Sequence, residues 1–572
     1  MRLIVRDYLS MLKESGELDA LLGDLLLCMD IEPISKAQIG VRQHGVDLAA
    51  VGPDPDETGT EKVFLFIVKA GDINRSIWDA PKQGIRPSLN EVLDVYLPKR
   101  LDEKYACLPK KVVVCCNGDL KQEVDQNWIA FKEKEGKRHG VDFDFWGGDK
   151  LSGYIVTYFL DEYLFPETAR TKIRKTLALV GLPEYDLSHF YSLIEETLFE
   201  RQLPRGKSAS ASRKRLKAIR LVHLALRILF TWAQEENYVK PAVLAAEYTL
   251  LRVWDCMRVL NLLRNKKTVT EFLRIYNTYQ DILRMYYNKI QTHCQVRDGL
   301  FGWGYRGDEI EYPLRTFEVI GILGTLGVSQ FYEFAATGDE NRLENMRSVA
   351  ETLVSLLKNN PSANLPPFDG HSIEICIGLL LLHYAGRRRE AAQWIDDLIG
   401  KICIAYRIGQ HFPIASDSYD DLIALEIGQA ESKEKLTDCS TIFPLLAQWC
   451  AILRLEEIYA GLRENVERFF PHSTLQVWYP DENSETVLYK TNASRTGVAI
   501  KIEPLPSEID DVKDHIRRIQ KSLLDPTEIS CLGKRGFLII GLIASRHYRT
   551  PVMPFYWQSL VDHESQGETG GK

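Results

Sequence analysis

The residues most able to do chemistry lie in the first hundred positions. Asp47 is at the end of a short apolar run in GVDLAAVG (45–52), and Lys69 lies in a stronger run, KVFLFIVKAG (62–71). An acid and a lysine on neighbouring strands can bind a divalent cation and a phosphate group. A carboxylate two residues before the lysine would share its face of the strand. That position is Ile67, which has no oxygen for a metal.

The elements that must hold these residues follow from hydrophobic spacing. Leucines at helical spacing predict an amphipathic helix at 17–31, with Asp19 beside its apolar face. In chain order, the pattern then predicts a strand at 37–52, a loop at 53–61, a buried strand at 62–71, a helix at 86–100, a buried strand at 110–118, and a strand leading into a helix at 141–160.

This order, with Asp47 and Lys69 where they fall, resembles the PD-(D/E)xK nuclease superfamily, and within it the Mrr-like restriction and defence nucleases. The matching pieces are GVDLAAVG, FIVKAG and FDFWGGDKLSGYI, all within residues 1–165. The family's motif is short and degenerate, and Ile67 departs from it. The resemblance implies an α/β restriction-endonuclease-like domain that cleaves nucleic acid with Mg²⁺ or Mn²⁺.

The resemblance also implies roles for single residues. Asp47 would bind the metal, and Lys69 would position the attacking water and stabilise developing negative charge. In some relatives the second acid has moved to the helix after the lysine strand, so we expect Glu91 to replace the missing carboxylate. Relatives often carry an acid on the first helix, where Asp19 lies, and the carbonyl oxygen of Val68 completes the expected metal ligands.

Each of these residues also has an ordinary explanation. A lysine at a strand end can extend its ammonium group to water. Glu91 and Asp19, taken singly on amphipathic helices, are more often surface charges than ligands. Asp72 is a weaker candidate for the missing carboxylate because it follows the strand end.

Three parts follow one another along the chain. Residues 1–165 form the nuclease-like domain, 166–470 an all-α array that senses a signal or acts as a scaffold, and 471–572 a small α+β region with a disordered tail. Strands are expected within 473–490. Turn-rich segments of the array could line a ligand pocket, although aromatic packing and helix N-caps are the more common explanation; their residues are Trp303, Tyr305, Asp308, Asp369, His371, His411, Asp417 and Tyr419.

Basic residues gather in two places. LPRGKSASASRKRLKAIR (203–220) has no acid, and it is either a solvated linker into a helix or a strip that contacts phosphates. The nucleic-acid-binding candidates in this run are Arg213, Lys214, Arg215 and Lys217. Near the C-terminus, Arg546, His547 and Arg549 could contact phosphate or a partner.

Composition narrows the class of protein. The 572 residues are 45% hydrophobic and 26% charged with a net charge of −8, so any contact with DNA must be local. No apolar run reaches the roughly 20 residues that span a membrane, no signal peptide is apparent, and the scattered cysteines indicate a reducing cytosol. The phosphate loop of ATPases, H-E-x-x-H and G-x-S-x-G do not occur.

The sequence therefore predicts a cytoplasmic, Mg²⁺-dependent endonuclease effector, in the manner of bacterial anti-phage defence proteins. Its substrate would be DNA, which we expect to be double-stranded, and its helical region would bind a protein partner or an activating ligand. A homo-oligomer is compatible with this prediction, and a membrane is not expected. The alternative is a catalytically inactive nuclease-like domain that serves as a DNA- or protein-binding scaffold.

Overall fold

The computed structural model of the chain describes residues 2–34, 44–57, 60–81, 84–159, 167–182, 185–200, 203–206, 208–302, 310–409, 411–430, 432–481, 483–490, 498–501, 505–522 and 536–561. Contacts divide the chain into two compact units, Met1–Gly181 with Asp186–Asn237, and Leu182–Tyr185 with Tyr238–Lys572. The expected boundaries at 165 and 470 do not coincide with this division, because the first unit also contains helices up to residue 235.

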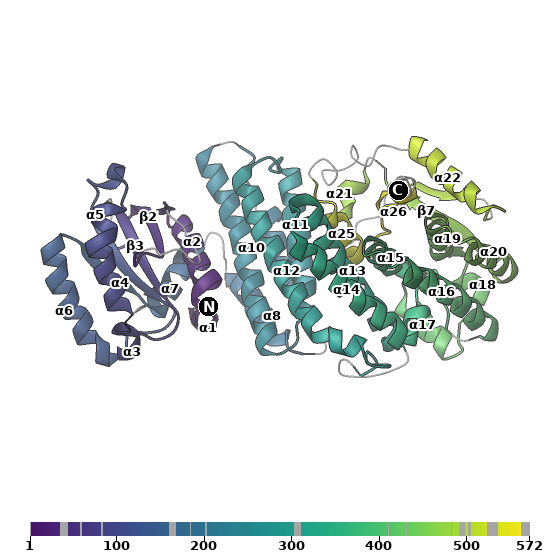
Figure 1. Ribbon diagram of the computed structural model, residues 1–572, viewed down its shortest axis with the longest axis horizontal. Coiled ribbons are helices and arrows are strands. Elements are labelled where there is room, and N and C mark those ends of the chain that lie inside the picture. Colours follow the sequence, from purple (N-terminus) through teal and green to yellow (C-terminus); the bar gives the residue numbers. More distant parts are fainter. Residues whose placement is uncertain are drawn as a thin grey trace, which may run out of the picture. The chain divides into compact units, whose positions relative to one another are not determined.

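A five-stranded mixed sheet forms the centre of the first unit (Figure 1). Its spatial order follows the chain: β1 (Glu32–Pro33), β2 (Leu48–Pro53), β3 (Glu61–Lys69), β4 (Lys110–Cys116) and β5 (Asp142–Trp146). The first three strands pair antiparallel, and β3, β4 and β5 run parallel. Leu48 pairs with Phe66 and Lys69 with Cys116, so the start of β2 lies beside the end of β3.

Helices cover both faces of this sheet (Figure 1). Leu65 and Ile67 of β3 pack into an apolar core with Trp78 and Leu89. Trp78 ends α3 (Arg75–Trp78) and Leu89 belongs to α4 (Ile85–Glu91), and α6 (Gln122–His139) adds Trp128 to the same core. The opposite layer consists of α1 (Arg2–Ser10), α2 (Asp19–Cys28) and α7 (Gly148–Tyr154). An N-terminal α/β domain before a long helical region was predicted from the sequence, and this arrangement is confirmed.

Three further helices complete the first unit: α8 (Glu167–Leu179), α9 (Ser188–Glu195) and α10 (Ala209–Glu235). The run at 203–220 leads into a helix, as the first of its two interpretations expected. From Ala209 onward it forms the first turns of α10, where Ser208 caps the helix by accepting a hydrogen bond from the Ala211 amide.

The second unit is mainly helical. Its helices are α11 (Lys240–Val259), α12 (Lys266–Cys294), α13 (Glu311–Thr337), α14 (Glu340–Asn359), α15 (Ser372–Tyr384), α16 (Arg388–Ile408), α17 (Tyr419–Glu426), α18 (Lys433–Leu436), α19 (Ile442–Leu453), α20 (Glu456–Phe469), α21 (Ser484–Leu488), α22 (Ile509–Ser522), α25 (Ile539–Tyr548) and α26 (Phe555–Gln558).

Helix α13 is the centre of this array. Among the described helices it alone is long and apolar enough to cross a membrane, but 67% of its apolar window is buried, as in the core helix of a soluble protein. Glycines of α13 let α15 approach α13 closely. A Cβ atom at Gly324 would lie 2.7 Å from Ile377, and one at Gly327 would lie 2.4 Å from Leu381.

A small second sheet joins β6 (Cys439–Ser440), β7 (Thr474–Tyr479) and β8 (Val498–Lys501). The expectation of strands across 473–490 is therefore only half right. β7 is a strand, but the segment after it forms α21, and the antiparallel partner of β7 is β8. The tail predicted to be disordered, 564–572, lies outside the described residues.

Candidate active site

Asp47 is placed by a tight turn that packs on α4. His44 and Gly45 have positive φ angles of 51° and 81°, and a Cβ atom at Gly45 would lie 2.3 Å from the carbonyl oxygen of Ser88. Glycine is required there both by the backbone conformation and by the space. The Asp47 amide then donates to the carbonyl of Phe66, and the Asp47 carboxylate accepts a 2.7 Å hydrogen bond from the amide of Val68.

Lys69 ends β3 beside this carboxylate. Its ammonium group donates to Glu14 Oε1 at 2.8 Å, and its side chain is 15% exposed. Glu14 lies in η1 (Glu14–Leu18), a kinked turn between α1 and α2 in which Gly16 has a φ of 83°. The sequence analysis missed Glu14. Its only local signal was its place in KESGELD, a glycine-broken segment just before the first predicted helix.

The electrostatics of Asp47 show that these groups share one site. Burial raises its pKa most, and the Val68 amide and the Lys69 ammonium act in the opposite direction. Glu14 and Asp19 are the carboxylates that raise the pKa of Asp47 further. Three carboxylates around one ammonium group leave two negative charges in excess at this end of the sheet.

Ile67 does not face this charge cluster. Its side chain is 1% exposed and belongs to the apolar core between the sheet and α4. A carboxylate at this position would be surrounded by side chains such as Leu65 and Leu89, where burying its charge would be costly. Position 67, where the resemblance places an acid, is therefore part of the apolar core in this chain.

The expected set of metal ligands is brought together only in part. Asp19 lies within electrostatic reach of Asp47, and Glu91 is the last residue of α4, the helix on which Gly45 packs. Within the described ranges, no three His, Cys, Asp or Glu side chains form a group that could hold a metal ion. Asp47, Asp19 and Glu91 therefore do not form a preassembled metal cage.

The predicted nucleic-acid-binding residues divide into two kinds. Arg213 and Lys214 are exposed on the first turns of α10, and Arg213 pairs with Asp30 at 3.2 Å. Arg215, in contrast, is 6% exposed, and its guanidinium group donates to the carbonyls of Pro204 and Gly206. Burial of Arg215 and the binding of its Nη1 group to backbone carbonyls are against the expected contact with phosphate. Lys217 is half-buried.

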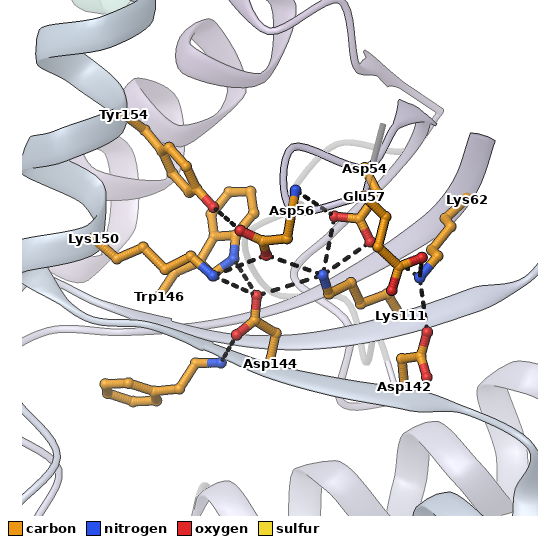
Figure 2. Close-up of polar contacts among 11 residues, drawn as sticks. Asp54, Asp56, Glu57, Lys62, Lys111, Asp142, Asp144, Trp146, Lys150 and Tyr154 are labelled. Carbon is orange, nitrogen blue, oxygen red and sulfur yellow. Dashed lines mark hydrogen bonds and ion pairs between the residues drawn. The ribbon is translucent and has the colours of Figure 1, made fainter. Parts of the chain in front are cut away.

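A second charged cluster lies at the opposite end of the sheet, and the sequence analysis did not anticipate it (Figure 2). Lys62 is the second residue of β3 and lies within 3.1 Å of three carboxylates. Lys111, in β4, pairs with carboxylates of the β2–β3 loop, and Lys150 of α7 reaches two of the same acids. The carboxylates of this ion-pair network are Asp54, Asp56, Glu57, Asp142 and Asp144.

The ion-pair network is a structural crosslink. Burial opposes the charge on Lys62 and Lys111, but their carboxylate partners outweigh it and raise the pKa of both ammonium groups. Burial likewise opposes the charge of Asp56, yet Lys150 and Lys111 lower its pKa to about 2. Every ammonium group is thus held by at least two carboxylates, which leaves none to bind a substrate phosphate.

The expected pocket residues of the helical array are mostly structural. Asp369 is buried and accepts hydrogen bonds from Ser440, from the amide and hydroxyl groups of Thr441, and from the Ile442 amide at the start of α19. His371 is buried against the ring of Phe368. This supports the explanation by helix caps and aromatic packing for these two residues.

The remaining candidates of the second unit are distributed as follows. Asp417 lies against Gly370, Tyr419 is 61% exposed, and His411 is 4.0 Å from Glu426. Trp303, Tyr305 and Asp308 lie outside the described residues.

The basic C-terminal residues are paired inside the array. Arg546 and His547 are buried against Glu247, and Arg549 donates to Glu374. Arg546 and His547 are therefore not available to a phosphate, contrary to the sequence-based expectation.

Comparison with known proteins identifies no relative: no family model, no curated protein and no solved structure matches the chain.

Proposed function

We propose that the first unit cleaves phosphodiester bonds in nucleic acid, with Asp47 and Lys69 as its catalytic pair. The observation that supports this most is the meeting of both residues at one end of the sheet, with Glu14 and Asp19 around them. The element order of the first unit and the resemblance to PD-(D/E)xK nucleases support the same proposal. The ion-pair network at the other end offers no comparable chemistry because its charges are mutually satisfied.

Lys69 and Asp47 can have different roles in the reaction. The Lys69 ammonium group, positioned by Glu14, stabilises negative charge that develops on a phosphate. The Asp47 carboxylate orients water, and its raised pKa makes it a stronger base than an ordinary aspartate. The rate of hydrolysis should therefore be higher at a pH above the pKa of Asp47, where its carboxylate is ionised.

A divalent cation fits the excess negative charge of this site. Mg²⁺ keeps several of its waters and needs only one or two protein carboxylates together with substrate phosphate. Asp47 and Asp19 would hold it, with the Val68 carbonyl or Glu91 as further oxygen donors. The cation would supply charge neutralisation and a more acidic water. The absence of a three-ligand group among the described residues means that such a cation would be bound mainly in the presence of substrate.

The long helical unit supports a role as an effector. A nuclease domain joined to a helical array suggests that the array binds a protein partner or an activating ligand and restrains cleavage until then. On this proposal the protein acts in the bacterial cytoplasm in defence against phage, on double-stranded DNA, and a homo-oligomer is compatible with this role.

Cleavage of end-labelled DNA and RNA by the full chain, with Mg²⁺ or Mn²⁺, tests the proposal. We expect cation-dependent products with the unmutated protein and none with Asp47→Asn. Equal cleavage by both proteins would overturn the assignment of Asp47. If the unmutated protein binds nucleic acid but cuts none with either cation, the scaffold alternative replaces the proposal; the burial of Ile67 is the observation that favours it.

A further inference from the structure

We propose that Asn117 is a positioning residue for this site, which holds Glu14 against Lys69. Its importance for catalysis rests on the proposed function, but its effect on the Lys69–Glu14 pair does not. Asn117 follows the last residue of β4 and is 2% exposed. Its described hydrogen bonds go to backbone groups and to neither side chain of the pair, so its proposed influence is through the backbone of the segments that carry them.

The Asn117 side chain joins those two segments. Its Oδ1 accepts a 2.6 Å hydrogen bond from the amide of Gly71, two residues after Lys69. Its Nδ2 donates to the carbonyls of Leu9 at 2.7 Å and Leu12 at 2.8 Å. Leu12 lies two residues before Glu14, at the point where the chain leaves α1. One amide group thus fixes the end of β3 relative to the segment that delivers Glu14.

Only an amide side chain of this length matches all three partners. Asn117 supplies one acceptor for an amide and two donors for carbonyls. An aspartate would keep the bond to Gly71 but would turn a negative oxygen toward the carbonyls of Leu9 and Leu12. In a buried position those carbonyls would lose a partner that water cannot replace.

The Lys69–Glu14 pair needs this support. Glu14 is 45% exposed on its side chain, and a partly exposed ion pair by itself contributes little free energy. The kinked turn that carries Glu14 contains Ser15 and Gly16 in non-helical conformations, so it has no regular helix to hold it. The pair therefore depends on a fixed distance between β3 and the end of α1, and Asn117 sets that distance.

The test compares two isosteric substitutions in the full chain. Asn117→Asp removes the donors at the Lys69 end of the sheet. Asp144→Asn makes the reverse exchange in the ion-pair network at the other end. Each protein is treated with an amine-acylating reagent at fixed pH, the rate at which the Lys69 ammonium group is modified is measured by peptide mass spectrometry, and thermal unfolding is recorded in parallel.

We expect Asn117→Asp to raise the rate of Lys69 modification by roughly two- to fivefold, as for the loss of a weak ion pair, and Asp144→Asn to leave it unchanged. If Asn117→Asp does not fold, Asn117→Ser removes the same donors without adding charge. A Lys69 rate that stays at the unmutated value in the Asn117 variant overturns the proposal. So does an equal rise in Asp144→Asn, because that would be general loosening of the domain.

The acylation result does not require cleavage, so it separates this proposal from the proposed function. If the protein cuts nucleic acid, the Asn117 variant should also lower kcat while KM is unchanged, since Lys69 would still be present but misplaced. If the protein cuts nothing and Lys69 modification still rises, Asn117 positions the pair and the nuclease proposal alone fails.

Discussion

At the residue scale, Asp47 is held under conditions that disfavour its charge. It is partly buried and lies near two other carboxylates. One amide and one ammonium group stabilise its negative charge in return. Carboxylates in such surroundings are typical of functional sites, where stability is given up for reactivity. Lys62 and Lys111 show the opposite case, since each of these buried charges has several partners.

Asp47→Asn should make the first unit more stable at neutral pH. The pKa of Asp47 is raised on folding, so the cost of its charge is absent below the ordinary value of 3.8 and fully present above the raised pKa. Asparagine keeps an acceptor for the Val68 amide and carries no charge. We expect a gain of about 0.5–2 kcal/mol at pH 7 and little gain near pH 3, measured by urea unfolding. A loss of stability at pH 7 would contradict this view of the site.

Glu14→Gln should impair cleavage more than Glu91→Gln does. Glu14 contacts Lys69 and acts on Asp47, whereas Glu91 is the last residue of α4, the helix that packs on the turn at Gly45. Both substitutions conserve shape, so unfolding temperatures should stay close to that of the unmutated protein. The measurement is the single-turnover cleavage rate of each variant. A larger loss of cleavage rate with Glu91→Gln would support the sequence-based expectation that Glu91, in α4, replaces the missing carboxylate.

At the element scale, the helices and strands with regular apolar spacing were predicted from the sequence. The buried strands β3 and β4 and the leucine-rich α2 were identified because their apolar spacing survives in the fold. The Lys69–Glu14 pair was not identified from the sequence. It depends on a turn broken by glycine and on the side chain of Asn117, 46 residues beyond Gly71. The segment after β7 was predicted as a second strand but forms α21, so its local sequence alone did not determine its structure.

Lys111→Met should destabilise the first unit strongly. It leaves the buried Asp54 with fewer partners, and breaking one side of a buried ion pair costs roughly 3–5 kcal/mol. Urea unfolding measures this cost, and the double variant with Asp54→Asn should recover part of it. If Lys111→Met is neutral, the ion-pair network is not a structural crosslink.

The ion-pair network should contribute less to the stability of the first unit at acidic pH. The pKa of Asp54 and of Asp56 is lowered in the folded protein, the latter to about 2, so their contribution is present above 3.8 and is lost as the pH falls from there toward 2. In Lys111→Met this loss should be smaller. Unfolding curves recorded at several pH values in that window measure the difference.

At the scale of the whole molecule, the chain divides into two compact units, and we expect two unfolding transitions. Lys111→Met should lower only the first-unit transition. Asp369→Ala, which removes four hydrogen bonds at the start of α19, should lower only the other, by roughly 2–4 kcal/mol. Differential scanning calorimetry of the two variants measures this. A single transition that both substitutions shift equally would show that the units unfold together.

The central claim is that the catalytic end of the sheet is the end that carries Lys69. The direct measurement is the rate of Mn²⁺-dependent cleavage of DNA by Lys69→Ala, with Lys150→Ala as the matched control from the ion-pair network at the opposite end. The account predicts that Lys69→Ala abolishes cleavage and that Lys150→Ala retains it at temperatures where both proteins are folded. Cleavage that persists in Lys69→Ala, or that is lost only in Lys150→Ala, would contradict it.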